Sequence, residues 1–294
     1  MIKPIFSIII PTYNSLKTLD KTIRSVLNQT FKYYEIIVVD DGSTDNTCRK
    51  LKDYKDTRIK LFKIERSGGP AKPRNFGISK SNSNWICFLD SDDLWEKNKL
   101  STLFKYIKKK KFDVLCHNEF LKKRNNIKVS KYGPFKKNFY NHLLINGNLL
   151  STSATMLNKN FLIKNNLKFN ESRNFVSVED YDLWMMLAKK EAIFLFIDDT
   201  LGTYLIHNHG ISQNNFKHLN NLRKLFFHHV FKIQKFENDK KALWKYLEKK
   251  VDILLIINNF RKKPFNFNLT IKLFFFLLFN LIFIIKFYKR KFLT

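Results

Sequence analysis

Cysteine is scarce in this chain, and its scarcity narrows the class of protein. Only three cysteines occur, Cys48, Cys87 and Cys116, and their spacing matches no metal-ligand pattern. So few cysteines, in an odd number, favour a reducing compartment over one that forms disulfides. Cys87 lies within a short apolar run, so we expect it to be a small core residue.

A glycine-rich nucleotide loop and an N-terminal leader are also missing. No Gly-x-Gly-x-x-Gly segment follows the first apolar run, residues 5–10, which argues against a dinucleotide-dependent oxidoreductase. A sugar nucleotidyltransferase would carry a Gly-rich basic loop at the same place, where this chain has Pro11. The run at 5–10 is too short for the apolar part of a signal peptide. We therefore expect no signal peptide.

Acidic residues are few beside the basic ones. The chain has 25 Asp and Glu against 54 Lys and Arg, a formal net charge of +29. Such an excess suits an anionic partner, which can be nucleic acid, an acidic membrane surface or a phosphorylated substrate. A compositional bias is the alternative, because the lysines are spread over the whole chain. The length, 294 residues, allows one large α/β domain or one domain with an appendage.

Short apolar runs are abundant, and they alternate with helix-like segments over the first hundred residues. We expect buried strands at residues 6–10, 36–39, 59–64 and 85–89. Helical patterns lie between successive runs, and this alternation predicts a parallel sheet covered by helices on both faces. Right-handed crossovers then bring the C-terminal ends of the strands to one edge, where ligands bind in such sheets.

Polar residues gather where three of these runs end. Pro11 follows the first run, Asp40 and Asp41 the second, and Asp90 and Asp92 the fourth. Asp90 and Asp92 are two residues apart, so an extended chain would point both to one side. Two carboxylates at the end of a core strand repel each other, and a divalent cation would offset that repulsion. Oxygen ligands suit Mg²⁺ or Mn²⁺, so we expect a metal site here.

The second half of the chain is less regular. Helices are expected at residues 100–107 and 178–190, strands at 112–117, 153–157 and 193–197, and two basic helices at 217–263. Residues 122–138 are basic and polar, and we expect a surface excursion there.

An apolar run of thirteen residues, 273–285, lies near the C-terminus and is interrupted only by Asn280. Its length is short for a membrane span and favours an interfacial or buried helix. Three basic residues at 289–291 follow, which fits an anionic membrane surface. A helix buried against residues 217–260 is the alternative.

Four segments resemble the signature segments of family 2 glycosyltransferases. They are residues 7–14 (SIIIPTYN), 38–45 (VVDDGSTD), 68–77 (GGPAKPRNFG) and 88–95 (FLDSDDLW). Their order and separations make the resemblance specific. It implies the α/β GT-A fold, a Rossmann-like, mostly parallel sheet with helices on both faces, to which this chain would add a helical C-terminal appendage.

The resemblance also implies a division of the chain. We expect a GT-A glycosyltransferase domain at 1–212, with a nucleotide-binding half at 1–100 and an acceptor and catalytic half at 101–212. A basic helical extension would follow at 213–263. The last part, 264–294, would be an apolar segment that associates with the membrane.

The donor-binding residues are implied by the same resemblance. Pro11 and Tyr13 would line the nucleotide base, Asp41 would accept the uracil N–H, and Asp90 would contact the ribose. Arg74 stands beside a Gly-Gly-Pro turn, where a phosphate could meet both backbone and cation. A purely structural role for Arg74 is the alternative.

The metal ligands follow from the same comparison. Asp90-Ser-Asp92 resembles the DXD motif of the family, in which Asp92 would bind Mn²⁺ or Mg²⁺ bridging the diphosphate. Asp93 would be a second metal contact or the cap of a helix beginning near Leu94, and we favour the cap. His207 stands where family members carry a histidine that reaches the metal or the diphosphate.

Glu179 and Asp180 resemble the catalytic acidic pair of the family. Asp180 precedes Leu183 and Trp184 by three and four residues, so one helix face carries all three and should point inward. Asp180 would then act as the general base, supported by Glu179. Acids that merely stabilise a helix start are the alternative.

These expectations describe an inverting glycosyltransferase. It would move a sugar from a nucleotide-sugar donor, UDP-linked by our reading, to a hydroxyl of a glycan or lipid-linked acceptor in cell-surface polysaccharide or lipopolysaccharide synthesis. We expect it in the cytoplasm, peripheral to or C-terminally anchored at the inner face of the cell membrane, on an anionic surface. A sugar nucleotidyltransferase and a non-catalytic nucleic-acid-binding protein are the alternatives, but we expect no nucleic acid, because that role needs no carboxylates at three strand ends.

Overall fold

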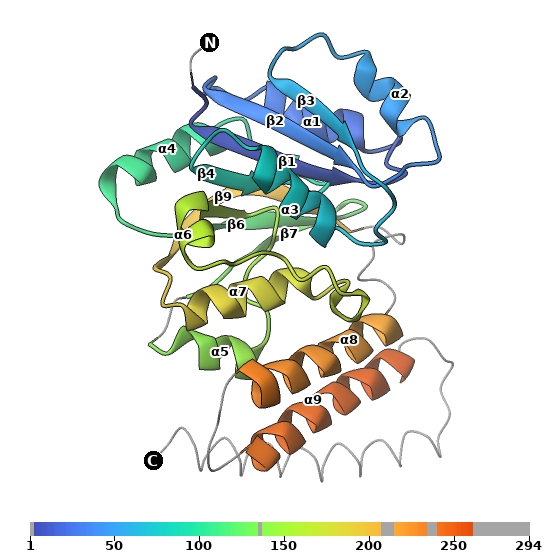
Figure 1. Cartoon of the computed structure of the whole chain (residues 1–294), viewed down its shortest axis with the longest axis vertical. Coiled ribbons are helices and arrows are strands. Elements are labelled where there is room, and N and C mark those ends of the chain that lie inside the picture. The colour runs from blue at the N-terminus through green and yellow to red at the C-terminus, as the bar shows by residue number, and fades with distance from the viewer. Residues whose placement is uncertain (1–2, 135–136, 207–214, 234–239, 261–294) are drawn as a thin grey trace. The chain divides into compact units, whose positions relative to one another are not determined.

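The computed structural model describes residues 3–134, 137–206, 215–233 and 240–260. The chain divides into two compact units, Met1–Asn208 and His209–Thr294 (Figure 1). The domain boundaries expected at residues 212 and 263 stay predictions, because both fall in stretches outside the described residues.

A parallel four-stranded sheet forms the first half of the first unit. Its strands lie in the order β3-β2-β1-β4, and neighbouring strands are parallel. They are β1 (Phe6–Thr12), β2 (Tyr34–Asp40), β3 (Ile59–Lys63) and β4 (Trp85–Phe88). The helices between them are α1 (Leu19–Leu27), α2 (Thr47–Lys52) and α3 (Ala71–Lys80). The predicted alternation of strands and helices and the parallel pairing are therefore confirmed.

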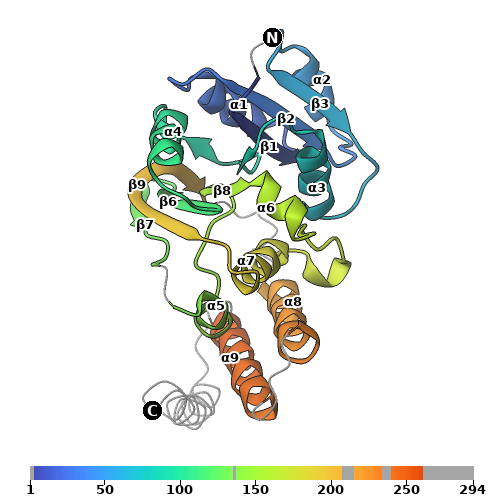
Figure 2. The same ribbon diagram turned by 60° about the vertical axis from the view of Figure 1, so that its left-hand side comes forward.

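Alternate side chains of β1 pack against different helices. Ile8 and Ile10 face one layer of the core, together with Ile23 of α1. Ile9 points the other way, towards α3, where a Cβ added to Gly77 would lie 2.5 Å from Ile9 Cγ2. The period of two along a strand thus separates the two helical layers, one on each face of the sheet (Figure 2). Glycine at position 77 allows the close approach of α3.

The sheet continues beyond β4 with strands of both directions. The order is β4-β8-β6-β9-β5, and β7 pairs with the outer part of β6. The added strands are β5 (Leu94–Trp95), β6 (Val114–Lys123), β7 (Asn126–Ser130), β8 (Thr155–Asn158) and β9 (Phe194–Leu205). Because β8 is antiparallel to both β4 and β6, β6 and β9 run in the direction of β4. The C-terminal ends of β1, β4 and β6 therefore share one edge.

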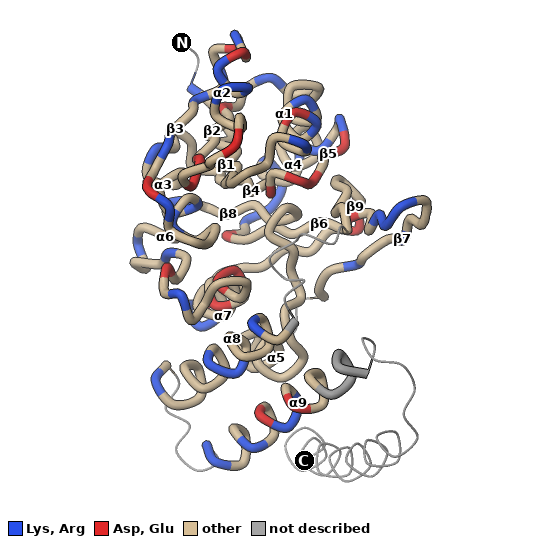
Figure 3. The backbone as a smooth tube through the Cα atoms, turned by 90° about the vertical axis from the view of Figure 1, so that its right-hand side faces the viewer, with Lys and Arg blue, Asp and Glu red and all other residues tan. Residues whose placement is uncertain are grey.

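Four more helices belong to this unit. They are α4 (Lys99–Lys109), α5 (Phe139–Asn146), α6 (Lys159–Lys164) and α7 (Glu179–Lys189), with a short 3₁₀ turn at Arg173–Phe175. Residues 122–138 include the end of β6, the turn and β7, which form a hairpin that projects from the molecule and carries basic residues near its tip (Figure 3). The surface excursion expected there is in part a regular strand pair.

Two local expectations are wrong. No helix begins near Leu94, because residues 94–95 form β5 and pair with β9. Pro11 does not end the first strand, which continues to Thr12 beside β2. The next helix, α1, begins at Leu19, and the Asn14 side chain between strand and helix accepts hydrogen bonds from the backbone N–H groups of residues 44 and 45.

The second unit is helical, as expected for the appendage. It contains α8 (Asn215–His228), a π-helical turn (His229–Ile233) and α9 (Lys240–Phe260). The Phe227 and Trp244 rings meet edge to face, 5.4 Å apart, and Arg223 forms an ion pair with Asp252. Within the described residues no helix has the length and apolar character to cross a bilayer. The apolar run at 273–285 lies outside them.

Candidate functional site

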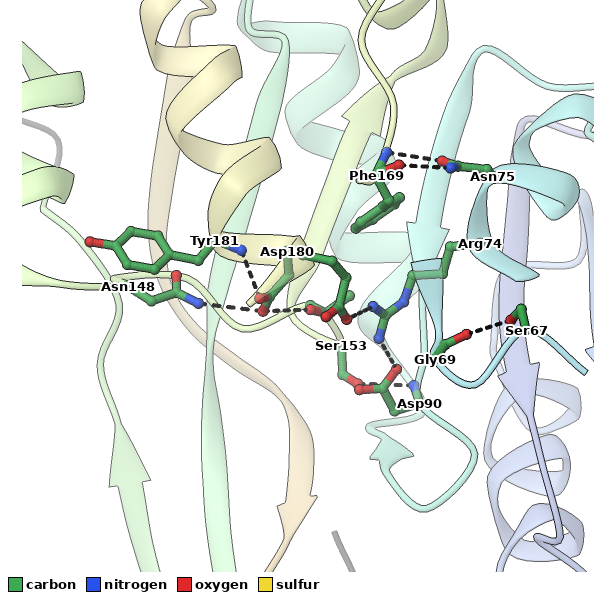
Figure 4. Close-up of polar contacts among 12 residues, drawn as sticks. Ser67, Gly69, Arg74, Asn75, Asp90, Asn148, Ser153, Phe169, Asp180 and Tyr181 are labelled. Carbon is green, nitrogen blue, oxygen red and sulfur yellow. Dashed lines mark hydrogen bonds and ion pairs between the residues drawn. The ribbon is translucent and has the colours of Figure 1, made fainter. Parts of the chain in front are cut away.

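Arg74 lies at the centre of a buried cluster of charges at the C-terminal edge of the sheet. Its side chain is only 3% exposed, and its Nη1 and Nη2 donate to Glu179 Oε1 at 2.8 Å and Asp90 Oδ1 at 2.6 Å (Figure 4). Its guanidinium also lies 5.3 Å from the centre of the Phe169 ring. One cation thus joins α3, the loop after β4 and the first residue of α7.

The cluster of Arg74 and Glu179 is electrostatically strained. Burial raises the pKa of Glu179 to about 7, and the neighbouring Asp180 also raises it. The attraction of Arg74 lowers the same pKa, but by a smaller amount. For Arg74, burial lowers the pKa, but Asp90 and Glu179 outweigh it and raise the pKa well above its ordinary value. The arginine therefore stays charged, while Glu179 lies close to its titration point at neutral pH.

Asp180 stands in the first turn of α7, beside this cluster. Its Oδ2 accepts hydrogen bonds from Thr152 Oγ1 at 3.1 Å and Asn148 Nδ2 at 3.3 Å, and its Oδ1 accepts one from the Tyr181 backbone N–H at 2.7 Å (Figure 4). Burial raises the pKa of Asp180, and it outweighs Arg74 and the hydrogen bonds from the Tyr181 N–H and Thr152, which lower that pKa. A carboxylate with a raised pKa is a better proton acceptor, so the arrangement suits a general base.

Ser153 holds the loop that carries Asp90. Its Oγ accepts a hydrogen bond from the Asp90 backbone N–H at 3.0 Å and donates one to Asp93 Oδ2 at 2.6 Å. Its carbonyl oxygen accepts from Lys99 Nζ at 2.7 Å, and burial lowers the pKa of Lys99 to about 8. Ser153 and Lys99 were both missed by sequence reasoning. Neither residue carries a local sequence signal for this role, because both act through contacts with distant segments.

Asp93 faces the core rather than the edge of the sheet. Its side chain is buried, and its Oδ1 accepts a hydrogen bond from the Leu205 backbone N–H at 3.1 Å. Burial raises the pKa of Asp93, and the neighbouring Asp92 and Asp90 raise it further. The interpretation of Asp93 as a helix cap is wrong, because the next helix begins only at Lys99. Its carboxyl instead ties the loop to the end of β9.

Asp41 is held by the turn that precedes α3. Its Oδ1 accepts hydrogen bonds from the backbone N–H and the Oγ of Ser67, both at 2.7 Å, and its Oδ2 accepts from the Gly68 N–H at 3.2 Å. Arg66 forms an ion pair with the same carboxylate and lies over the Tyr13 ring, 3.5 Å from its centre. Arg66 was not singled out from the sequence.

Residues 66–74 therefore connect two groups of predicted site residues. At one end of the segment, Arg66 contacts both Asp41 and Tyr13. At the other end, Arg74 contacts Asp90 and Glu179. Pro11 lies in β1, opposite Val39 at the end of β2 and so next to the Asp40-Asp41 pair. His207 lies outside the described residues.

A cavity of about 200 Å³ opens beside the Arg74 cluster. Its walls are the turn before α3 and the segment 170–176, and Glu179 forms part of its lining. Gly69 lines it too, with its Cα facing Val176, where an added Cβ would lie 3.1 Å from Val176 Cγ2. The small residue therefore keeps this wall of the cavity open.

The acidic residues at this edge fit a divalent cation that a substrate helps to bind. Among the described residues, no three His, Cys, Asp or Glu side chains converge as a complete protein metal site. Magnesium in nucleotide sites, however, takes one or two carboxylates and completes its shell with substrate phosphates and water. Asp90 and Asp92, on the loop after β4, supply such oxygen donors.

Comparison with known proteins gives concordant results. The model of the family described as Glycosyl transferase family 2 matches residues 7–167. The Escherichia coli protein described as UDP-Glc:alpha-D-GlcNAc-diphosphoundecaprenol beta-1,3-glucosyltransferase WfgD is 35% identical over 214 residues, which are 72% of this chain and 81% of that protein. WfaP of Escherichia coli, described by the same activity, is 32% identical over 72% of this chain and 82% of its own length.

Solved structures share the fold. S. aureus TarS in complex with UDP-GlcNAc superposes with a TM-score of 0.64 at 22% identity, over 85% of this chain and 81% of that chain. The mannosyltransferase PcManGT from Pyrobaculum calidifontis, in complex with GDP-Man and Mn2+, gives 0.60 at 16% identity, over 85% of this chain and 70% of that chain. The predicted fold is thereby confirmed.

Proposed function

The chain belongs to glycosyl transferase family 2 and is a glycosyltransferase of the GT-A fold, and we propose that it is an inverting enzyme that transfers a sugar from a UDP-linked donor to a hydroxyl of a lipid-linked glycan. The observation that carries this proposal is the cluster in which Arg74 joins Asp90 to the first turn of α7. Two hydrogen bonds of Arg74 link the proposed donor-binding loop to Glu179, the residue that precedes the proposed base in the chain.

The proposed reaction assigns one task to each group. Asp180 accepts the proton of the acceptor hydroxyl as the hydroxyl oxygen attacks the anomeric carbon. The bond to the nucleoside diphosphate breaks on the opposite face of the sugar, and no covalent sugar–enzyme intermediate forms. Glu179 and Arg74 keep the start of α7 and Asp90 in fixed positions. Pre-positioned groups of this kind lower the barrier because they need no rearrangement in the transition state.

The donor contacts are proposed from the neighbouring groups. Pro11, Tyr13 and Asp41 would receive the nucleotide, and Asp90 the ribose. Asp92, with His207 as a further candidate ligand, would hold Mn²⁺ or Mg²⁺, and such an ion would neutralise charge on the departing diphosphate. We assign no metal contact to Asp93, because both of its oxygens accept hydrogen bonds inside the core.

The acceptor is proposed from the relatives. WfgD and WfaP are described as acting on GlcNAc-diphosphoundecaprenol, a lipid-linked substrate. We propose an acceptor of the same class, used in cell-surface polysaccharide synthesis at an anionic membrane face. The segment 264–294 would add a C-terminal attachment, and its deletion should then lower the membrane-bound fraction. Equal partitioning of the shortened and full chains would contradict that attachment.

Asp180→Asn tests the proposed base. It should lower kcat for transfer by about 10²–10⁴-fold, because the amide cannot accept the proton. Binding of the UDP-sugar, measured by calorimetry, should persist. Asp182→Asn is the matched control, since it removes an acid from the same helical turn. If both variants lose activity equally, the acids only stabilise the helix start and the base assignment is wrong.

The donor is identified by a panel of UDP-, GDP- and dTDP-sugars with Mn²⁺. We expect thermal stabilisation and donor turnover with UDP-sugars above all. The panel also tests the role of Asp92, because Asp92→Asn should weaken the dependence of UDP-sugar binding on Mn²⁺. A preference for GDP- or dTDP-sugars would refute the proposed donor class while leaving the base assignment intact.

A further inference from the structure

The hairpin of β6 and β7 extends beyond the edge that carries the site, with β9 paired to β6 as far as Lys122. Leu115 of β6 and Cys87 of β4 both pair with Met156, so these two residues are level in the sheet. Asp90 follows Cys87 by three residues, whereas β6 continues for eight residues beyond Leu115 to Lys123. At about 3.3 Å per residue, the tip of the hairpin extends roughly 15 Å past the level of Asp90.

The hairpin is strongly basic. Residues 120–131 contain no acidic residue and five basic ones, Lys122, Lys123, Arg124, Lys128 and Lys131, all exposed (Figure 3). Within the described part of the chain none of the five forms an ion pair. The described residues therefore leave the positive charge at this edge without a paired carboxylate, and it is available to an anionic partner.

One face of the hairpin is also apolar. Ile127 and Val129 are 56% and 50% exposed, and they alternate along β7 so that both point to the same side. The pairing places Val129 opposite Phe120 and Ile127 opposite Lys122. Basic residues on an edge strand can simply prevent aggregation, but that role does not account for two exposed aliphatic side chains on one face.

We propose that the β6–β7 hairpin docks on an anionic lipid surface, with Ile127 and Val129 entering the headgroup region while the basic residues bind lipid phosphates. Aliphatic side chains flanked by Lys and Arg are typical of elements that lie at a membrane interface. A site for single-stranded nucleic acid would instead offer stacked aromatic rings. The proposal rests on the proposed function in one respect, since a lipid-linked acceptor would present its hydroxyl near the same surface.

A fluorophore at position 127 tests this contact in the full chain. Ile127→Cys would be labelled with an environment-sensitive dye in a Cys48→Ser background, because Cys87 and Cys116 are buried. Vesicles with phosphatidylglycerol should shift its emission to the blue, and brominated lipids should quench it. Vesicles of phosphatidylcholine alone should do neither.

Ile163→Cys is the matched control. Ile163 is an aliphatic residue, 65% exposed, next to Lys164, on the helix α6 that follows β8. Because β8 is antiparallel to β4, it ends beside Trp85, at the opposite edge of the sheet. A dye at 163 should not respond. If the chain binds the vesicles with no change at 127, or with equal changes at both positions, the proposal is overturned.

Charge neutralisation supplies the second test. Substituting glutamine for Lys122, Lys123, Arg124 and Lys128 should lower partitioning onto phosphatidylglycerol vesicles by roughly three orders of magnitude. Glutamine at residues 108–111, four exposed lysines that precede β6, removes the same charge at the opposite edge. That control should lower partitioning much less. Equal losses, or a wild-type chain that retains DNA but not vesicles, would exclude a lipid contact at the hairpin.

The acceptor used in the activity assay separates this inference from the proposed function. The hairpin variant should turn over a short-chain, water-soluble GlcNAc-diphosphate acceptor at the wild-type rate, and lose activity only when the acceptor is embedded in vesicles. A wild-type chain that binds vesicles through position 127 but transfers no sugar would refute the proposed function alone. A hairpin variant with unchanged activity on the embedded acceptor would refute the docking alone.

Discussion

Arg74 is a buried cation shared by two carboxylates, and replacing it with methionine tests how far these contacts hold the site together. The change leaves Asp90, which is 34% exposed, and Glu179, which is 5% exposed, without their common partner. Breaking a buried ion pair by removing one partner costs about 3–5 kcal/mol. Water can replace Arg74 at Asp90 but not at Glu179, so we expect a loss near the lower end, about 3 kcal/mol at pH 8.

The loss of stability in the Arg74→Met variant should depend on pH, and the direction of that dependence follows from the pKa of Glu179. That pKa is raised to about 7, so Glu179 takes up a proton on folding, and stability falls as the pH rises from about 4.5 to 7. Arg74 lowers this pKa, so without Arg74 the Glu179 carboxyl stays protonated to a higher pH. The decrease in stability then continues to that higher pH. The deficit of the variant should therefore be largest at pH 8 and smaller by about 1 kcal/mol at pH 5, where Glu179 is protonated in both proteins.

Urea unfolding followed by tryptophan fluorescence at pH 5, 6.5 and 8 measures this dependence. Adding Glu179→Gln to the Arg74→Met variant should recover much of the loss at pH 8, because no buried charge is then left unpaired. Arg24→Met is the control, since Arg24 pairs with Asp20 on the surface and should cost less than about 0.5 kcal/mol. A deficit below about 1 kcal/mol at pH 8, or one that is equal at every pH, would refute the reasoning.

Substitutions at three further positions have expected outcomes. Asp93→Asn should leave the unfolding free energy at pH 7 unchanged or higher, because burial raises the pKa of this carboxyl and so disfavours its charged form. Asp93→Leu should instead lower the unfolding free energy by about 1–3 kcal/mol, because the Leu205 N–H is left unpaired. Urea titration distinguishes the two variants. Gly77→Ala should lower the unfolding free energy by about 1–3 kcal/mol, because its Cβ would lie 2.5 Å from Ile9, and an unchanged urea midpoint would contradict this. Asp41→Asn should weaken UDP-sugar binding about tenfold in calorimetry, because the side-chain NH₂ group would face backbone N–H groups of the surrounding turn that now donate to the carboxylate.

The sequence by itself determined the parallel half of the sheet and the edge at which the site lies. Strands covered on both faces must be apolar along their length, and β1 and β2 are buried at every position. The polar residues that end such runs, among them Asp41 and Asp90, are therefore brought to one edge whatever the details of packing. Four motifs in order were enough to indicate the family.

Other features were decided only by the tertiary structure. Leu94 and Trp95 form a strand because they pair with β9, more than a hundred residues away, and local pattern favoured a helix there. Ser153 and Lys99 carry no local sign that they support the loop after β4. Their roles arise from hydrogen bonds between segments that are distant in the chain.

The same reason explains what remained open about Arg74. Its neighbours in sequence are a turn and a short helix, which suit a phosphate-binding or a structural arginine equally well. Its actual partners, Asp90 and Glu179, lie 16 and 105 residues away. Apolar periodicity reports which side chains avoid water, and that is a local property of the chain. The partner of a buried charge depends on how the elements pack, and only the folded structure supplies it.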